Sequence, residues 1–187
     1  MKRGKLVDSY VDLIITPREQ QSIPVLISSV FAQLHFQLVT RAKGDVGVSF
    51  PHADKKSLGD TLRLHGQAVV LNELLAGERL RRMKDYYRSP TVANIPAEHS
   101  WRRVARFQKG MTAAKARRLV ARGSITEERA QALYDETAAR VDLPFLQLQS
   151  ASTGGRYKLF VAQTEYEGST ASVSFNSYGM GGCVPWF

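Results

Sequence analysis

The first 95 residues combine two apolar spacings in a fixed order, and this order limits the fold more than any other feature of the sequence. Val7–Ile15 alternates apolar and polar side chains, which predicts a strand with one buried face. From Ser22 to about Arg41 the spacing becomes helical, with Ser22 placed as N-cap and Pro24 in the first turn. The apolar stripe that this helix should turn toward the core consists of Ile27, Val30, Phe31, Leu34 and Leu38.

The same region continues with a second set of these patterns. The further elements expected are a strand at 46–50, a strand at 61–66, a helix at 71–86 and a strand at 91–95. The resulting order, β-α-β-β-α-β, is that of a ferredoxin-like (RRM-like) domain. Because that fold supports many unrelated functions, it predicts no chemistry by itself.

A boundary is expected at Asn94–His99, which is polar and contains Pro96. We therefore predict an α+β protein with a ferredoxin-like domain at residues 1–95 and a C-terminal α/β part at residues 96–187. The second part should contain a strand or extended linker at 101–108, a basic helix at 112–122, a helix at 125–140, and strands at 145–148, 156–164 and 171–177. Its apolar end, with Trp186 and Phe187, should dock on the core.

Positive charge is concentrated in one stretch of the chain. Residues 101–122 carry eight Lys and Arg side chains and no Asp or Glu, in a chain of formal net charge +9. An uninterrupted basic stretch repels itself, and it usually has a polyanion to bind. Nucleic acid is the first candidate, and a solvated basic face is the alternative.

Helical spacing gives the basic helix a narrow charged ridge. Lys115, Arg118 and Arg122 fall within an arc of about 60°, and Arg117 lies off this ridge. Thr112 is placed to cap the helix and Gly123 to stop it, while Ser124 and Glu127 have capping-box spacing for the next helix. A narrow basic ridge suits a groove between phosphate strands, but it does not distinguish RNA from DNA.

A second basic group lies just before this helix. It consists of Arg102, Arg103 and Arg106, with Gln108 beside them. Arg can bond the O6 and N7 atoms of guanine, and Gln can bond the N6 and N7 atoms of adenine. The group therefore suits base recognition, with a solvated strand face as the alternative.

Two features could carry acid–base chemistry. His35 lies at the edge of the apolar stripe of the first helix, where a histidine either packs as a half-buried structural residue or transfers protons. The loop 149–155 offers Ser150, Ser152 and Thr153 followed by two glycines, which suits contacts to phosphate or ribose. The same composition is also typical of an ordinary hairpin turn.

The composition excludes several other classes of protein. Cys183 is the single cysteine, so an internal disulfide and a cysteine-based zinc cluster are excluded. The four histidines lie far apart in the sequence, and no long apolar run suggests a membrane span. We therefore expect a cytoplasmic protein with no metal site, no cofactor and no membrane partner.

Six short motifs together resemble one family. They are Val30-Phe-Ala-Gln-Leu-His35, Val46-Gly-Val-Ser-Phe-Pro51, Asp142-Leu-Pro-Phe145, Ser150-x-Ser-Thr-Gly154, Tyr178-Gly and the ending Gly181-Gly-x-Val-Pro-Trp-Phe187. On these motifs, from about Ser9 to Phe187, the chain resembles the CRISPR repeat-processing endoribonuclease of type I-F systems. The resemblance implies metal-independent cleavage of CRISPR precursor RNA at the base of the repeat hairpin. It also implies that the mature guide RNA stays bound, and that other subunits of the type I-F surveillance complex are partners.

The resemblance also assigns roles to individual residues. The catalytic histidine of the family falls on His35, its essential serine on Ser150, and the tyrosine that orients the histidine on Tyr178. The residues matched to RNA binding are Arg103, Arg106, Gln108, Lys115, Arg117, Arg118, Arg122, Ser152, Thr153 and Tyr157. Of these, Arg106 and Gln108 match the readers of the lowest base pairs, and Tyr157 matches an aromatic that stacks on the terminal pair. The chain departs from the family at Ala121, where an arginine can stand.

RNA contributes much of the chemistry that this family implies. The ribose 2′-OH is an internal nucleophile next to its own phosphate, so the enzyme supplies in-line geometry and proton transfer. With His35 as the base and Ser150 holding the ribose, the products would be a 2′,3′-cyclic phosphate and a 5′-OH. The alternatives are a non-catalytic module that binds RNA hairpins, a metal-dependent nuclease and a DNA-binding regulator.

Overall fold

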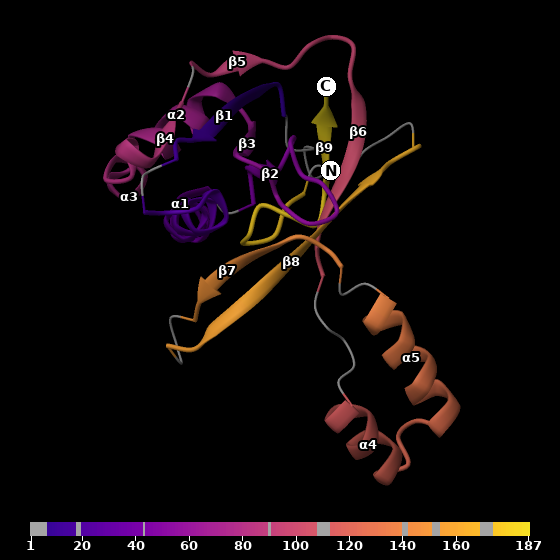
Figure 1. The fold of residues 1–187 in the computed structure, drawn as a ribbon. Coiled ribbons are helices and arrows are strands. Elements are labelled where there is room, and N and C mark those ends of the chain that lie inside the picture. Colours follow the sequence, from indigo (N-terminus) through magenta and orange to yellow (C-terminus); the bar gives the residue numbers. More distant parts are fainter. Residues whose placement is uncertain are drawn as a thin grey trace.

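Two antiparallel sheets and a protruding pair of helices make up the chain (Figure 1). The structure is a computed structural model that describes residues 7–17, 20–42, 44–89, 91–107, 113–139, 142–150, 154–168 and 174–187. The α+β class predicted from the sequence is confirmed. The ferredoxin-like arrangement and the division into residues 1–95 and 96–187 stay predictions.

The first sheet has the strand order β2-β3-β1-β4, with β5 also paired to β1. Its strands are β1 Ser9–Ile15, β2 Gly47–Ser49, β3 Thr61–Gly66, β4 Tyr87–Arg88 and β5 Ala93–Asn94. The helices of this half are α1 Ile23–Gln37 with its π-helical extension η1 Leu38–Ala42, α2 Ala68–Ala76, α3 Glu78–Arg81 and the 3-10 turn η2 Lys84–Tyr86. The strands expected at 46–50, 61–66 and 91–95 are present, the first and last of them shorter than predicted.

The second sheet has the order β7-β8-β6-β9. Its strands are β6 Ser100–Phe107, β7 Phe145–Gln149, β8 Arg156–Glu165 and β9 Cys183–Trp186. The expectation of a final strand at 171–177 is wrong for the described residues 174–177, of which 174–176 are irregular and 177 begins a turn, while 171–173 lie outside the described residues. The last strand is β9 instead, and because β9 is an edge strand it tolerates Pro185, which pairs with Trp101.

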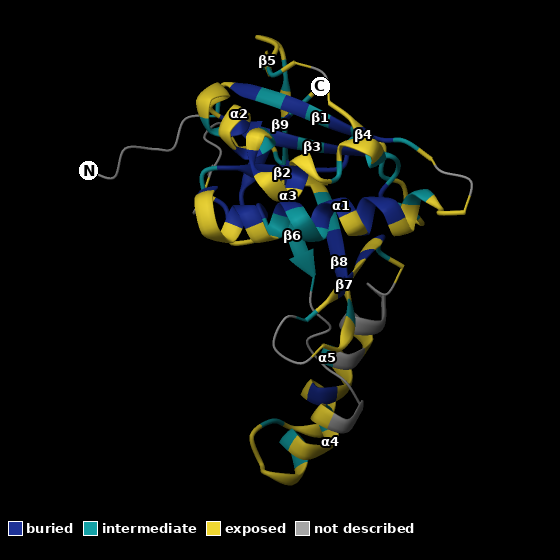
Figure 2. Cartoon of the chain, turned by 90° about the vertical axis from the view of Figure 1, so that its left-hand side faces the viewer, coloured by how far each residue is buried: buried dark blue, intermediate teal, exposed yellow. Residues whose placement is uncertain are grey.

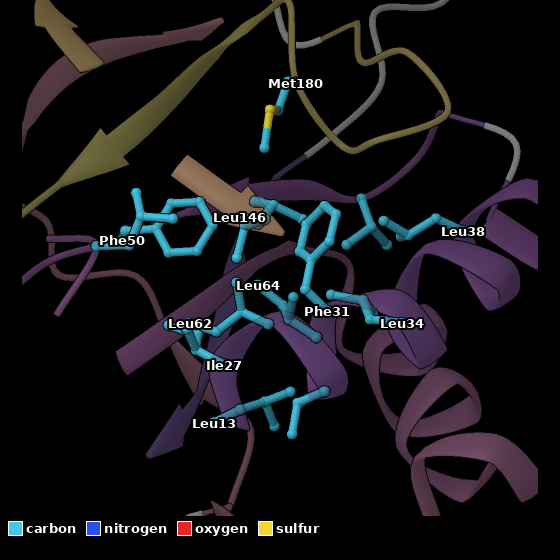
Figure 3. Packing of buried hydrophobic residues seen from close by; sticks show 14 of the residues in the cluster. Leu13, Ile27, Phe31, Leu34, Leu38, Phe50, Leu62, Leu64, Leu146 and Met180 are labelled. Carbon is cyan, nitrogen blue, oxygen red and sulfur yellow. The ribbon is translucent and has the colours of Figure 1, made fainter. Parts of the chain in front are cut away.

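Helix α1 lies at the centre of the core. All five residues of its predicted apolar stripe are buried. They pack with residues of both halves of the chain, including Leu64 of β3, Leu146 of β7 and Met180 of the C-terminal segment (Figure 3). By length and mean hydropathy, Ile23–Ala42 also passes a test for a membrane span, as core helices of soluble proteins do. Ser22 occupies the N-cap position, but its side chain makes no capping hydrogen bond with the described residues.

The helix expected at 71–86 is wrong in its extent. Helix α2 begins at Ala68 and ends before Gly77, whose backbone is extended and whose N–H donates to the carbonyl of Leu74. A new short helix, α3, starts after it. At this break Gly77 packs directly against the side chain of Gln37, which leaves no room for a β-carbon and so requires glycine at this position.

Helices α4 Ala113–Ala121 and α5 Glu127–Ala139 form a hairpin that projects away from the sheets (Figures 1 and 2). Gly123 ends α4 as predicted, with φ of 69° and an N–H that donates to the carbonyl of Val120. Thr112 lies outside the described residues. The capping box predicted at Ser124 is wrong, because Thr126 Oγ1 accepts the N–H of Arg129 at 3.2 Å and caps α5 two residues later.

Candidate active site and nucleic-acid surface

His35 occupies the last turn of α1 and is partly buried. Its imidazole ring stacks on the Tyr178 ring with centroids 4.2 Å apart and an interplanar angle of 12°. Its Nε2 atom is buried and has no hydrogen-bond partner among the described residues. Burial, and secondarily the positive charge of Arg106, lower the pKa of His35 below its usual value. The site therefore holds a neutral imidazole with an unused nitrogen, which suits a group that accepts a proton.

The turn that carries Tyr178 is fixed by Asn176. The side-chain oxygen Oδ1 of Asn176 accepts the N–H of Tyr178 at 2.8 Å and that of Met180 at 3.2 Å. Gly179, at φ of 72°, lies so close to Val48 that a side chain would collide with it. The Gly179 carbonyl also accepts the N–H of Val48 at 2.8 Å, which ties the turn to β2. The backbone of this turn therefore helps to hold Tyr178 against α1, in addition to the stacking of its own side chain on His35.

Two further side chains complete a cluster around Tyr178. The guanidinium of Arg106, on β6, lies 4.9 Å from the centroid of the Tyr178 ring. The hydroxyl of Tyr157, on β8, lies 3.3 Å from the hydroxyl of Tyr178. Burial, and then this hydrogen bond, raise the pKa of Tyr157 to about 12, so its phenol stays protonated at neutral pH. The structure thus brings together His35, Tyr178, Arg106 and Tyr157 from four separate segments.

Ser150 lies where β7 enters the turn to β8. Its N–H donates to the carbonyl of Gly155 at 2.8 Å, and its carbonyl accepts the N–H of Gly154 at 2.9 Å. Strand β7 packs along α1, and its Leu148 pairs with Tyr157 of β8. Ser150 therefore follows by two residues the strand position opposite Tyr157. Ser152 and Thr153, two of the predicted RNA contacts, lie outside the described residues.

Strand geometry divides the basic group of residues 102–106, contrary to the single cluster expected from the sequence. Side chains alternate along β6, so Arg102 and Arg106 share one face and Arg103 points to the other. Arg102 stacks over the Trp186 ring at 4.3 Å and lies 3.5 Å from the carboxylate of Glu165. Arg106 is therefore the arginine of β6 that lies beside Tyr178 and acts electrostatically on His35. Gln108 lies outside the described residues.

The basic side chains of α4 also divide into two sets. Lys115, Arg118 and Arg122 are exposed on the hairpin. Arg117 is exposed as well, but it also lines the cleft between α4 and α5, whose lining includes Glu127 and Glu128 of α5. The ridge residues differ from Arg117 in that they are not part of this lining.

Sequence reasoning missed Asn176, the residue that positions Tyr178. The sequence did contain a signal for Asn176, since an Asn shortly before a turn glycine commonly accepts the backbone N–H group two residues along the chain. As for metals, no group of three or more His, Cys, Asp or Glu side chains that could hold an ion occurs in the described part of the chain.

Comparison with known proteins agrees with the sequence motifs. The sequence model of a family described as "CRISPR-associated protein (Cas_Csy4)" matches residues 10–187. A protein of Escherichia coli (strain UTI89 / UPEC) called "CRISPR-associated endonuclease Cas6/Csy4" is 35% identical over 185 residues, covering 97% of this chain and 100% of that protein. A protein of the same name from Pseudomonas aeruginosa (strain UCBPP-PA14) is 35% identical over 187 residues, with the same coverage of both chains.

Proposed function

The chain belongs to the Cas_Csy4 family of CRISPR-associated proteins, and we propose that it is an endoribonuclease that processes CRISPR precursor RNA. It cuts at the base of the repeat hairpin, needs no metal ion and keeps the mature guide RNA bound. The observation that carries this proposal is the neutral imidazole of His35, which stacks on Tyr178 beside the positive charge of Arg106 and whose Nε2 atom has no partner in the described part of the chain. The names of the two relatives support the endonuclease activity.

The proposed reaction is an internal transfer within the RNA. His35 Nε2 takes the proton of the ribose 2′-OH, and the 2′-oxygen attacks the adjacent phosphorus. The bond from phosphorus to the 5′-oxygen of the next nucleotide breaks, and that oxygen takes up a proton from water. The products are a 2′,3′-cyclic phosphate and a 5′-OH. A buried imidazole without a partner gains a hydrogen bond when the 2′-OH arrives, which favours the reacting geometry.

The remaining residues hold the substrate in this proposal. Ser150 binds the ribose, and Ser152 and Thr153 contact the phosphate that is cut. Arg106 and Gln108 read the lowest base pairs of the stem, Tyr157 stacks on its terminal pair, and Arg103 adds a phosphate contact. The exposed Lys115, Arg118 and Arg122 of α4 follow the groove of the stem, with Arg117 beside them.

The biological setting follows from the same proposal. The partners are the repeat hairpin, the mature guide RNA and other subunits of the type I-F surveillance complex. The protein acts in the cytoplasm, where its RNA substrate is made. DNA of the same sequence lacks the 2′-OH, so it binds without being cut.

Incubation with the repeat hairpin of the neighbouring CRISPR array, in excess EDTA, tests the proposal. We expect a single cut at the base of the stem and an upstream product that resists 3′-end labelling until its cyclic phosphate is removed. Cleavage that needs added Mg²⁺ would show a metal-dependent nuclease. Tight binding without any cut would show a hairpin-binding module instead.

A further inference from the structure

A groove of about 600 Å³ runs between the first half of α1 and the β7–β8 hairpin. It lies apart from the cluster around Tyr178. Residues of α1, of the loop before β3 and of both hairpin strands form its walls. Those that matter below are Val25, Ser28, Lys56, Phe145, Gln147 and Arg156.

Hydrogen bonds fix the walls of this groove. The N–H of Gln147 donates to Ser28 Oγ at 3.1 Å, which joins β7 to α1 along the floor. On the opposite side, the carboxylate of Asp54 accepts the N–H groups of Lys56 and Ser57 at 2.7 and 2.6 Å. These two bonds lower the pKa of Asp54, so it stays ionised and holds the loop. The groove is therefore part of the folded structure and not a gap between loose segments.

The charges along the groove suit an anion. Lys56 and Arg156 line it, and the ammonium of Lys158 lies 4.1 Å from the centroid of the Phe145 ring on the same face of the hairpin. Among the described lining residues there is no Asp or Glu. Phe145 and Val25 are 37% and 53% exposed, respectively, so they offer apolar surface beside these cations. Cations that meet phosphates, next to an exposed aromatic ring that meets bases, are typical of grooves for single-stranded nucleic acid.

The groove borders the loop that carries the serine of the cutting site proposed above. Gln149 lines the groove, and Ser150 is the next residue. Helix α1, which forms its other wall, ends in the turn that carries His35. In Figure 1 the end of β7 and the start of β8 lie on the left, whereas α4 and α5, where the stem is proposed to lie, project to the lower right. A strand that leaves the site on the side opposite the stem therefore meets this groove.

We propose that this groove binds the single-stranded RNA that follows the cut, so that the enzyme recognises nucleotides 3′ of the hairpin as well as the hairpin itself. This inference rests on the proposed function. Its ligand is a short RNA strand of any sequence, because the cations contact phosphates and a ring stacks on any base.

The test uses the full protein and two RNAs that cannot be cut. Both carry the repeat hairpin with 2′-deoxyribose at the cutting position, one ending at the next nucleotide and one extended by four. Fluorescence anisotropy gives the dissociation constant of each. For the wild type we expect the extension to tighten binding about three- to tenfold, the effect of one or two phosphate contacts. The double variant Lys56→Ala/Arg156→Ala should lose this gain.

A matched control exists in the neighbouring residue. Lys55 is exposed but does not belong to the described lining, so Lys55→Ala removes one charge and should keep the gain. Equal binding of both RNAs by a wild type that still cuts the hairpin would overturn the groove proposal and leave the proposed function intact. The groove proposal would also be overturned if Lys55→Ala lost the tighter binding of the extended RNA, or if the double variant kept it. Failure to bind the short hairpin would instead contradict the proposed function.

Discussion

The imidazole of His35 and the phenol ring of Tyr178 lie parallel, with centroids 4.2 Å apart, although 143 positions separate them in the sequence. Stacking fixes the orientation of the imidazole, while its Nε2 atom has no hydrogen-bond partner among the described residues. This nitrogen is the atom to which the proposed mechanism assigns the proton transfer.

The first prediction concerns the charge that acts on His35. Arg106→Gln removes a positive charge that disfavours the imidazolium, so the pKa of His35 should rise toward its usual value. Titration of the His35 ring protons by NMR in the free protein measures this. Arg103→Gln is the matched control, because it removes the same charge from the opposite face of β6 and should leave the pKa where it was. An unchanged pKa in Arg106→Gln would contradict the account.

The second prediction concerns stability in acid. His65 is fully buried, its Nε2 atom lies 2.8 Å from Ser49 Oγ, and burial followed by the charge of Arg63 lowers its pKa to about 3. Below pH 6.5 the unfolded chain therefore binds a proton that the folded chain does not. The contribution of His65 to the free energy of unfolding should therefore be complete above pH 6.5. Below pH 6.5 the free energy of unfolding should fall by about 1.4 kcal/mol per pH unit because of this residue.

Urea unfolding between pH 7 and pH 4.5 measures this slope. His65→Gln should flatten it, whatever its effect on stability at pH 7. His99→Gln, at a partly buried histidine outside the core, should leave the slope unchanged. A wild-type slope equal to that of His65→Gln would show that His65 takes up its proton in the folded state as well.

The third prediction concerns Asn176 as a positioning residue. Asn176→Ala removes the acceptor of two backbone N–H groups, which should cost about 1–3 kcal/mol of unfolding free energy. It should also slow cleavage at saturating RNA, because Tyr178 no longer holds the imidazole. Asn176→Asp keeps the accepting oxygen, so it should retain most of the unfolding free energy and most of the cleavage rate. If Asn176→Ala loses stability but cuts at the wild-type rate, the turn does not position the base.

The fourth prediction separates binding of the stem from reading of its bases. Arg118→Ala and Arg122→Ala should weaken binding to any hairpin of similar shape and reduce the slope of log affinity against log salt by about 0.7–0.9 per lost phosphate contact. Arg106→Ala and Gln108→Ala should cost about 1–3 kcal/mol on the correct stem and little on one with altered lowest pairs. Arg81→Ala, on exposed α3, is the control. Equal losses by all four variants on both hairpins would mean one undivided basic patch.

The elements that the sequence predicted well are those whose pattern is local. The apolar stripe of α1 is long and strictly periodic, and every residue of it is buried. Gly123 ended α4 as expected because a left-handed glycine stops a helix without tertiary help. Among the candidate site residues, His35 and Tyr178 came from motifs, and the structure brings them into contact.

The failures have tertiary causes. At the break between α2 and α3, Gly77 packs against the side chain of Gln37, forty positions away, a contact that no local pattern reveals. The apolar C-terminal end was expected only to dock on the core, yet it forms β9, which pairs with β6 as an edge strand. The arginines of residues 102–106 seemed one group because sequence proximity hides the alternation of a strand.

The most direct test of the central claim is single-turnover cleavage of the repeat hairpin in excess EDTA by the wild type, His35→Ala and His99→Ala. If His35 Nε2 takes the 2′-OH proton, His35→Ala should cut about 10²–10⁴-fold more slowly while binding the hairpin with unchanged affinity. His99→Ala, at a partly buried histidine that belongs to no part of the proposed site, should cut at the wild-type rate. Cleavage by His35→Ala within a few fold of the wild-type rate would contradict the assignment of His35 as the base.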